Sequence, residues 1–365
     1  MSAAKPLLIE LGTEELPPKA LDELAAAFAR GVCDGLARRG IDAGLDAARV
    51  YATPRRLAVY VPDVAFAQPE QVIERRGPAV SAGIGADGQP AKALLGFAQS
   101  CGVGVDALEK LETDKGAWFV YRSVKPGQLV ADLVPDIVAE ALKALPIPKP
   151  MRWSDHDYSF VRPVHWLVML HGTTIIDGEV LGLKSGRKSR GHRFMHPQPI
   201  HVVDADSWED ALLAAKVIAD PAARRARIRE EVARVAVQTG GVPRLDDALL
   251  EEIANLTEWP VAIACTFELE FLAVPPEALV TTMEANQKFV PVFDAQGRLT
   301  EHFIGIANVD SRDPTEIRKG YERVIRPRFA DAKFFWDEDL KTPLASYQEA
   351  LKNVTYQQSL GSLWD

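Results

Sequence analysis

Apolar residues recur at two different spacings along the chain, and each spacing predicts a type of secondary structure. Leu21, Leu24, Phe28, Val32 and Leu36 recur every three or four residues and predict a long amphipathic helix. Further helices are expected at 91–101, 130–145, 206–215, 221–237, 249–256 and 276–285. Short apolar or alternating runs predict strands at 7–11, 50–52, 57–61, 118–124, 164–170, 174–183, 261–268, 289–293 and 303–309.

The order of these elements predicts an α+β fold. Strands and helices alternate irregularly in one or two lobes up to residue 310, instead of forming a regular βαβ array. From Pro314 onward the pattern predicts helices and no strand, so we expect an all-helical C-terminal segment. A proline-rich linker at 146–150 divides the first part. The expected domains are an N-terminal α+β lobe (1–150), a second α+β lobe (151–310) and the truncated start of a helical domain (311–365).

The composition is that of a globular protein. The 365 residues are enough for two or three domains, and no apolar run is long enough to cross a membrane. The N-terminus lacks the apolar segment of a secretory signal, so we expect a cytoplasmic protein with no membrane partner. Cys33, Cys101 and Cys265 are isolated, which argues against disulfides and against a zinc site built on paired cysteines.

The stretch from residue 184 to residue 193 is basic, although the net charge of the chain is −9. It contains no acidic residue and carries these side chains: Lys184, Arg187, Lys188, Arg190, His192 and Arg193. We expect a loop at the end of a hairpin, whose backbone N–H and guanidinium groups suit phosphate oxygens. A nucleic acid and an acidic protein surface are both compatible partners for a patch of this size.

The sequence contains no recognisable catalytic or metal site. It has no P-loop and no G-x-S-x-G nucleophile motif. The letters G-x-G-x-x-G at 83–88 lack the preceding strand and the following helix that a dinucleotide site needs. Six histidines lie between residues 156 and 201, but no carboxylate or thiol stands at a spacing that completes a metal site. We therefore predict no catalytic residue and no metal ligand.

Ten segments of the chain form an ordered set of motifs. They are IELGTEELPPKAL (9–21), TPRRLAVYV (53–61), RRGPAV (75–80), TDKGAWFVYR (113–122), LPIPKPMRW (145–153), FVRPVHW (160–166), SRGHRFM (189–195), EWPVAI (258–263), FLAVPPEALVTTMEANQKFVPVF (271–293) and ERVIRPRFADAKFFWDED (322–339). Together they resemble the β subunit of bacterial heterotetrameric glycyl-tRNA synthetase. The resemblance covers essentially the whole chain, which is similar to the N-terminal half of that longer subunit.

This resemblance implies a function and a set of partners. It implies a tRNA-binding and assembly subunit of glycine–tRNA ligase, a class II aminoacyl-tRNA synthetase, with partners tRNA(Gly), the α subunit and a second β subunit in an α2β2 assembly. The active site, with its ATP and Mg, is expected on the α subunit, and no cofactor is expected on this chain. The implied fold is a region similar to the B3/B4-type domains of the phenylalanine enzyme, followed by the start of an HD-like helical domain.

No family catalytic residue maps onto a position here. The candidates for contact with tRNA or the α subunit are Arg55, Arg56, Arg162, the segment Arg190–Arg193, Gln287 and Lys288, together with the rest of the basic stretch. Each of them could instead brace loops between lobes by pairing with a carboxylate. Two other functions stay open: an editing hydrolase that acts on mischarged tRNA, and a scaffold that docks the α subunit without touching RNA.

Overall fold

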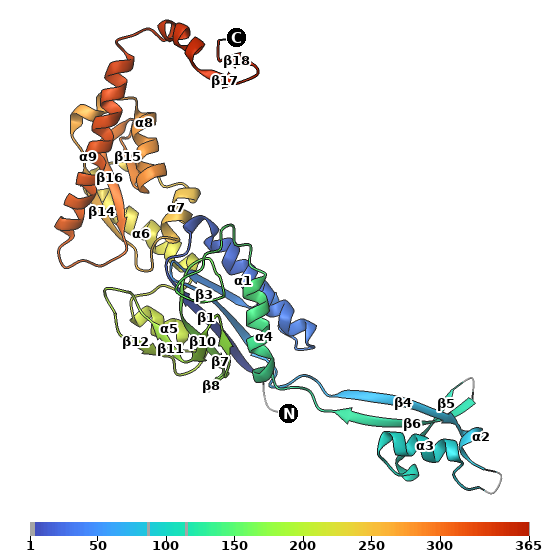
Figure 1. The fold of residues 1–365 in the computed structure, drawn as a ribbon. Coiled ribbons are helices and arrows are strands. Elements are labelled where there is room, and N and C mark those ends of the chain that lie inside the picture. The colour runs from blue at the N-terminus through green and yellow to red at the C-terminus, as the bar shows by residue number, and fades with distance from the viewer. Residues whose placement is uncertain (1–3, 86–87, 114–115, 365) are drawn as a thin grey trace.

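The structure, a computed structural model, describes residues 4–85, 88–113 and 116–364. Figure 1 shows an elongated molecule: an α+β body, an arm at one end, and a second lobe with a long helix at the other. The predicted α+β fold class is confirmed. Two letters of the G-x-G-x-x-G segment, Ala86 and Asp87, lie outside the described residues.

A mixed sheet forms the centre of the body. Its strands lie in the order β2-β3-β1-β7-β10-β9, and β8 also pairs with β7. They are β1 (Lys5–Thr13), β2 (Arg49–Thr53), β3 (Arg56–Val64), β7 (Val164–His171), β8 (Thr174–Ile175), β9 (Glu179–Val180) and β10 (Leu183–Gly186). β10 runs parallel to β7, whereas the other pairs in this sheet are antiparallel. Strands from both sides of the proline-rich linker thus belong to one sheet.

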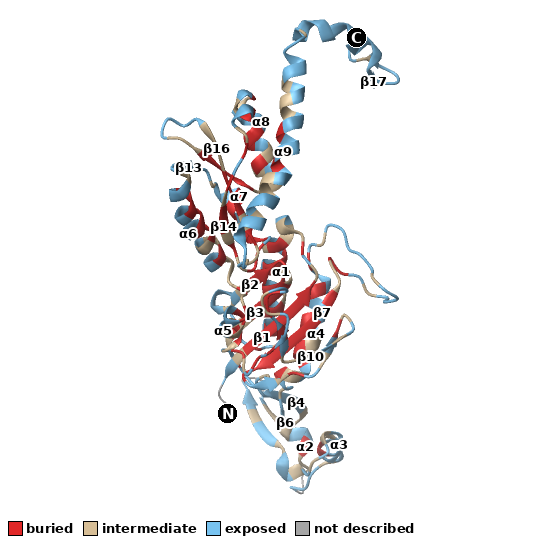
Figure 2. Cartoon of the chain, turned by 90° about the vertical axis from the view of Figure 1, so that its left-hand side faces the viewer, coloured by how far each residue is buried: buried red, intermediate tan, exposed pale blue. Residues whose placement is uncertain are grey.

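β1 is buried on both faces, which explains why its sequence is almost continuously apolar. Leu7, Ile9 and Leu11 belong to the core that α1 (Leu21–Arg38) and α4 (Val130–Lys143) share. Leu8 belongs to a second core on the opposite face, under α5 (Trp208–Ala214). Figure 2 shows the buried strands of this sheet at the centre of the body.

An arm made of residues between β3 and α4 extends away from the body (Figure 1). Its sheet has the order β4-β6-β5 and is accompanied by two helices. The elements are β4 (Gln71–Ala79), α2 (Val80–Gly83), α3 (Lys92–Cys101), β5 (Glu109–Thr113) and β6 (Gly116–Lys125). Most of the arm is exposed to solvent (Figure 2).

The second lobe is a four-stranded sheet between helices. The strand order is β13-β15-β16-β14. The strands are β13 (Val242–Pro243), β14 (Val261–Thr266), β15 (Val290–Phe293) and β16 (Leu299–Ala307), and the helices are α6 (Pro221–Thr239), α7 (Asp247–Ala254), α8 (Pro276–Thr281) and α9 (Pro314–Asp339). Helices α6 and α7 share one core with the sheet, and α8 and α9 share another. No helix in the described part of the chain combines the length and apolar character that a membrane crossing requires.

Short elements connect these parts. They are the 3-10 turns η1 (Pro18–Ala20), η2 (Leu45–Ala47), η3 (Val105–Ala107) and η4 (Leu269–Ala273), the π-helical turn η5 (Thr282–Gln287), and the paired strands β11 (Lys188–Arg190) and β12 (Pro199–His201). The basic stretch was predicted to be a loop, and this is wrong for most of it. Residues 184–186 and 188–190 belong to β10 and β11 and are paired with neighbouring strands, whereas His192 and Arg193 follow β11 outside any strand.

Two further expectations about local structure are wrong. The single strand expected at 174–183 is divided among β8, β9 and β10. Leu181 and Gly182 adopt positive φ angles of 51° and 71°, which end β9 and separate it from β10. The C-terminal segment is not all-helical. After the 3-10 segment η6 (Leu344–Asn353), β17 (Thr355–Gln357) pairs with β18 (Gly361–Ser362), and Gly361 with φ 95° follows the turn that joins them.

Candidate functional site

A buried carboxylate lies at the centre of the body, on the sheet face that α5 covers. Glu10 of β1 is completely buried and accepts four hydrogen bonds. Its Oε1 accepts from Arg56 Nη1 at 3.0 Å, Trp166 Nε1 at 3.0 Å and Ser189 Oγ at 2.7 Å, and its Oε2 accepts from Trp208 Nε1 at 2.8 Å. A charge removed from water needs partners of this kind, so the four donors stabilise Glu10 in the core.

Arg56 connects this carboxylate to the second lobe. Its guanidinium Nη2 donates to Glu258 Oε1 at 3.4 Å and to the carbonyl oxygen of Arg190 at 2.8 Å. Thr53 accepts from Arg56 Nε at 3.1 Å and donates to Glu258 Oε1 at 2.8 Å. Arg56 is fully buried, so it braces the two lobes and offers no surface to a partner in this structure.

His192 belongs to the same junction. Its Nε2 donates to the carbonyl oxygen of Asn308 at 2.7 Å, while its Nδ1 accepts the backbone N–H groups of Phe194 and Met195 at 3.3 and 3.2 Å. This pattern requires the neutral tautomer with the proton on Nε2, since the Asn308 partner is an acceptor. The Asn308 side chain accepts the backbone N–H of Glu258 at 2.8 Å. His192 therefore positions the turn that follows it and joins the lobes.

Two other predicted cations are held by neighbouring groups: Arg193 by carboxylates and Arg162 by backbone carbonyl oxygens. Arg193 Nη2 lies 2.7 Å from Glu14 Oε2, and His165 Nε2 lies 2.9 Å from Glu14 Oε1. Arg162 donates from Nε to the carbonyl oxygen of Glu15 at 3.0 Å. Partial burial acts to raise the pKa of Glu14, but the hydrogen bonds from Arg193 and His165 outweigh it and lower this pKa below its ordinary value.

Three cations of the basic stretch are exposed and form no ion pair with the residues that the structure describes. We call Lys184, Lys188 and Arg190 the free cations. The guanidinium carbon of Arg190 lies 5.9 Å from the centroid of the Trp166 ring. Arg187, by contrast, donates to backbone carbonyls and braces the neighbouring chain segments. Its acceptors are the carbonyl oxygens of Thr173, Val202 and Val203.

Arg55 completes the group around the tryptophan. Its guanidinium carbon lies 5.8 Å from the Trp166 ring centroid, and its buried Nε has no hydrogen-bond partner among the described residues. Burial lowers the pKa of Arg55, although the group stays charged at neutral pH. The structure thus gathers Arg55, Arg56 and Arg190 around Trp166, while the sequence analysis had not singled out the tryptophan.

The free lysines flank a hollow of about 400 Å³ beside β7. We call it the Trp166 hollow. Its described lining is apolar or cationic and contains no carboxylate: His165, Trp166, Leu167, Ile175, Leu183, Lys184, Gly186, Arg187 and Lys188. The hollow is therefore an apolar recess with a positive rim.

Gln287 and Lys288 lie apart from this group, in the second lobe. Lys288 follows η5 in a left-handed conformation with φ 59°, and its Nζ lies 2.9 Å from Glu252 Oε2. The structure does not bring these two residues together with the cations around Trp166. Their expected contact with tRNA or the α subunit stays a prediction.

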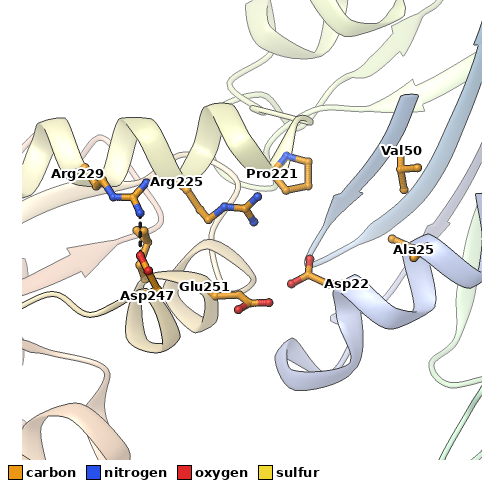
Figure 3. A pocket seen from close by; sticks show the side chains of 10 residues that line it. Asp22, Ala25, Val50, Pro221, Arg225, Arg229, Asp247 and Glu251 are labelled. Carbon is orange, nitrogen blue, oxygen red and sulfur yellow. Dashed lines mark hydrogen bonds and ion pairs between the residues drawn. The ribbon is translucent and has the colours of Figure 1, made fainter. Parts of the chain in front are cut away.

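A second hollow, of about 490 Å³, lies between the body and the second lobe (Figure 3). Asp22, Asp247 and Glu251 line it together with Arg225 and Arg229, so its charges are mixed. Figure 3 shows the Glu251 carboxyl group pointing across the gap towards Asp22. The hydrogen bond with Asp22, and then partial burial, raise the pKa of Glu251. This hollow is a joint between the lobes that carries charges of both signs beside apolar side chains.

Few groups in the described chain are poised for chemistry. Burial raises the pKa of the Cys33 thiol to about 11 and that of Cys265 to about 12, which suppresses the nucleophilic thiolate form at neutral pH. His171 is buried, with Nε2 at 3.0 Å from the carbonyl oxygen of Val64. Among the residues that the structure describes, no three His, Cys, Asp or Glu side chains are grouped so that they could hold a metal ion.

Sequence reasoning missed the acceptors at the centre of the site, Glu10 and Glu258. One signal was present: Glu10 interrupts the apolar run of a strand that is buried on both faces. A carboxylate in such a place needs a buried cation or several donors, and Arg56 was available in the motif that forms the neighbouring strand.

Comparison with known proteins agrees with the resemblance noted in the sequence. The family model described as glycyl-tRNA synthetase beta subunit matches residues 7–365. Proteins named glycine–tRNA ligase beta subunit from Xylella fastidiosa (strain M12) and Xanthomonas campestris pv. campestris (strain B100) are 53% and 55% identical over 365 residues, all of this chain. They are covered over 51% and 52% of their own length. A third, from Hahella chejuensis, is 50% identical over 359 residues, which are 98% of this chain and 52% of that protein.

The chain therefore spans about half the length of the curated relatives it matches. The identity holds over that whole span, and the ten motifs lie within it. On these grounds the chain belongs to the glycyl-tRNA synthetase beta subunit family.

Proposed function

We propose that this chain is a tRNA-binding and assembly part of a cytoplasmic glycine–tRNA ligase of class II. In this proposal the active site, with its ATP and Mg, lies on the alpha subunit, and the complex is an α2β2 assembly. The relatives' names support a ligase subunit that works with an alpha subunit and tRNA. The chain itself would bind RNA and position the lobes while the chemistry takes place on its partner.

The observation that carries the RNA-binding part is the group of free cations beside Trp166. Lys184, Lys188 and Arg190 form no ion pair with a described residue. Arg56, Arg187 and Arg193, by contrast, are bound to acceptors within the chain. Cations that form no ion pair attract phosphates, because each neutralised phosphate releases a condensed counterion, although Glu179 lies opposite Lys184 on the neighbouring strand. The net charge of the chain is −9, so this attraction has to be local.

The assembly part is supported by the rigid connection between the lobes. Buried hydrogen bonds join the body to the second lobe through Glu258 and Asn308. A fixed angle between lobes allows a large partner to contact both at once without an additional cost of ordering them. Three described groups are poorly suited to an editing hydrolase: the thiols of Cys33 and Cys265 have raised pKa values, and His192 is bound on both ring nitrogens.

The test compares two triple variants that remove equal charge. Lys184→Gln, Lys188→Gln and Arg190→Gln together should weaken binding of tRNA(Gly) by roughly 10-fold or more at physiological salt, since three phosphate contacts are lost. The control is Arg30→Gln, Lys110→Gln and Lys125→Gln, three exposed cations on α1 and on the arm. Equal affinities of the two variants for tRNA would contradict RNA binding at this surface. Unchanged tRNA affinity with weaker binding of the alpha subunit would favour the scaffold function instead.

A further inference from the structure

The Trp166 hollow lies where β7 lacks a strand partner on its outer edge. β8 pairs with β7 at Leu170 and His171, and β10 pairs with it at Leu167 and Val168. His165 and Trp166, nearer the start of the strand, line the hollow. The recess is therefore formed by regular elements, and the backbone around it is held in place by the sheet.

The lining of the hollow combines two chemical characters. Its accessible apolar surface comes mainly from Ile175 and Leu183, which are half-buried, since Trp166 and Leu167 are buried. Its volume of about 400 Å³ is in the range of small-ligand sites, roughly 300–1,000 Å³. Lys184 and Lys188 stand at its rim with no ion pair to any described residue. A nucleotide has a matching division into an apolar, planar base and an anionic phosphate.

We propose that the Trp166 hollow takes one unpaired nucleobase of bound RNA, while Lys184 and Lys188 contact the phosphates on either side of it. This inference rests on the proposed function and names the part of the RNA that the surface recognises. Bases in single-stranded loops and ends can be turned outwards into such recesses, whereas bases within a duplex cannot. The free cations would then bind the backbone that enters and leaves the hollow.

An apolar side chain of a partner protein is the competing occupant. The charge of the lining favours RNA. Lys184 and Lys188 form no ion pair, and no carboxylate stands among the described lining residues, so the hollow suits a polyanion. The hollow between the lobes illustrates the contrast. Asp22, Asp247 and Glu251 line it beside two arginines, a mixture that offers an RNA backbone no net attraction.

Gly186 allows the hollow to be filled without removing a charge. It lines the hollow, its φ is not positive, and a Cβ added to it would meet no atom within 4 Å. Valine is favoured in strands, so Gly186→Val should fold and place its methyl groups in the open space. Gly44→Val is the matched control, since a Cβ there also meets nothing within 4 Å and Gly44 does not line the hollow.

The experiment is a double-mutant cycle that combines one change in the protein with one change in the RNA. Fluorescence anisotropy would measure binding of a short single-stranded oligoribonucleotide, and of the same strand with an abasic residue placed at each position in turn. We expect one abasic position to weaken binding to the wild-type protein by roughly 10-fold, as for loss of one well-packed base. Gly186→Val should weaken binding of the intact strand by a similar factor and leave binding of that abasic strand unchanged. Gly44→Val should behave like the wild type.

Different failures have different meanings. If the wild-type protein binds neither tRNA nor the oligonucleotide, the proposed function itself is contradicted. If RNA binds and no abasic position matters, or Gly186→Val weakens intact and abasic strands equally, the base-binding hollow is overturned and the proposed function stands. Loss of alpha-subunit binding by Gly186→Val, with RNA binding unchanged, would assign the hollow to a protein side chain and also overturn it.

A second variant keeps the test independent of the folding of Gly186→Val. Lys184→Gln with Lys188→Gln changes two exposed side chains, and Lys110→Gln with Lys125→Gln removes equal charge from the arm. The first pair should make the salt dependence of single-strand binding shallower by about 1.4, at about 0.7 per phosphate for single strands. It should also leave the effect of the abasic position in place. Equal slopes for the two pairs would contradict the phosphate contacts.

Discussion

Nη1 of Arg56 lies 3.0 Å from Oε1 of Glu10, and both side chains are completely buried. The two residues lie diagonally on adjacent strands, since Glu10 is paired with Ala58 and Arg56 with Gly12, and Arg56 also reaches Glu258 in the second lobe. A charge in such a position is stabilised only while its partners remain. Arg56 is therefore one of several buried links between the two lobes, together with Thr53 and His192.

Replacement of Arg56 by methionine should strongly destabilise the protein. The change leaves Glu10 and Glu258 without their buried cation, and such losses cost about 3–5 kcal/mol. Urea unfolding followed by circular dichroism would measure the free energy of unfolding. Arg122→Met is the control, because Arg122 forms exposed pairs with Glu74 and Glu109 that contribute at most about 1 kcal/mol. Equal costs for the two variants would show that the buried pair is not a stabilising junction.

Gly12→Ala should also destabilise the body, for a steric reason. A Cβ at Gly12 would lie 1.9 Å from atoms of the Trp166 ring. The ring cannot easily move away, because its Nε1 donates to Glu10 in the core. Overpacking of this kind costs about 1–3 kcal/mol and should lower Tm in a thermal scan. Gly44→Ala, in open space, should leave Tm nearly unchanged. A Gly12→Ala protein as stable as the wild type would contradict the close contact.

The joint between the lobes should weaken as the pH rises through the titration of Glu251. Its pKa is raised by the hydrogen bond with Asp22 and by partial burial, although the charge of Arg225 acts in the opposite direction. A raised carboxyl pKa contributes stability that is fully present below the unfolded value, about 4.3, and is lost as the pH rises through the folded value. Glu251→Gln keeps a hydrogen-bond donor at every pH. Relative to this variant, the Tm of the wild type should fall between acidic and neutral pH. A constant difference in Tm between the two proteins would show that Glu251 and Asp22 do not share a proton in a hydrogen bond.

The three cysteines should react at very different rates. Cys33 and Cys265 are buried and have pKa values raised to about 11 and about 12, whereas Cys101 is partly exposed at the end of α3. Reaction requires both access and the thiolate, so iodoacetamide should modify Cys101 first in the native protein. Mass spectrometry after a short exposure would identify the labelled residue. Labelling of Cys265 at the rate of Cys101 would indicate that the second lobe opens readily.

Elements with a strong local signal could be predicted from the sequence. The apolar spacing between Leu21 and Leu36 corresponds to α1, and the bend expected at 53–56 is the turn between β2 and β3. β4 gave no such signal, because residues 71–76 are exposed on both faces and therefore show no alternation. The hairpin of β17 and β18 was missed for the same reason: its residues are largely exposed.

The candidate site depended on contacts between distant parts of the chain. Arg56 was predicted as a candidate for contact with tRNA or the α subunit, or as a brace between lobes. Its burial requires Glu10, which is 46 residues away, and Glu258, which is 202 away. The basic character of residues 184–193 was visible in the sequence. Which of these cations remain free depends on the acceptors that the fold places beside each one, and no local pattern encodes that.

In the proposed function, Lys184, Lys188 and Arg190 bind RNA phosphates. The most direct measurement is the affinity for tRNA(Gly) over a series of salt concentrations, for the wild type and for the variant in which all three are glutamine. The logarithm of affinity should fall less steeply with the logarithm of salt for the variant, by about 2 to 3, at about 0.9 for each phosphate contact on a helical backbone. An unchanged slope, equal to that of the Arg30, Lys110 and Lys125 control variant, would contradict the account.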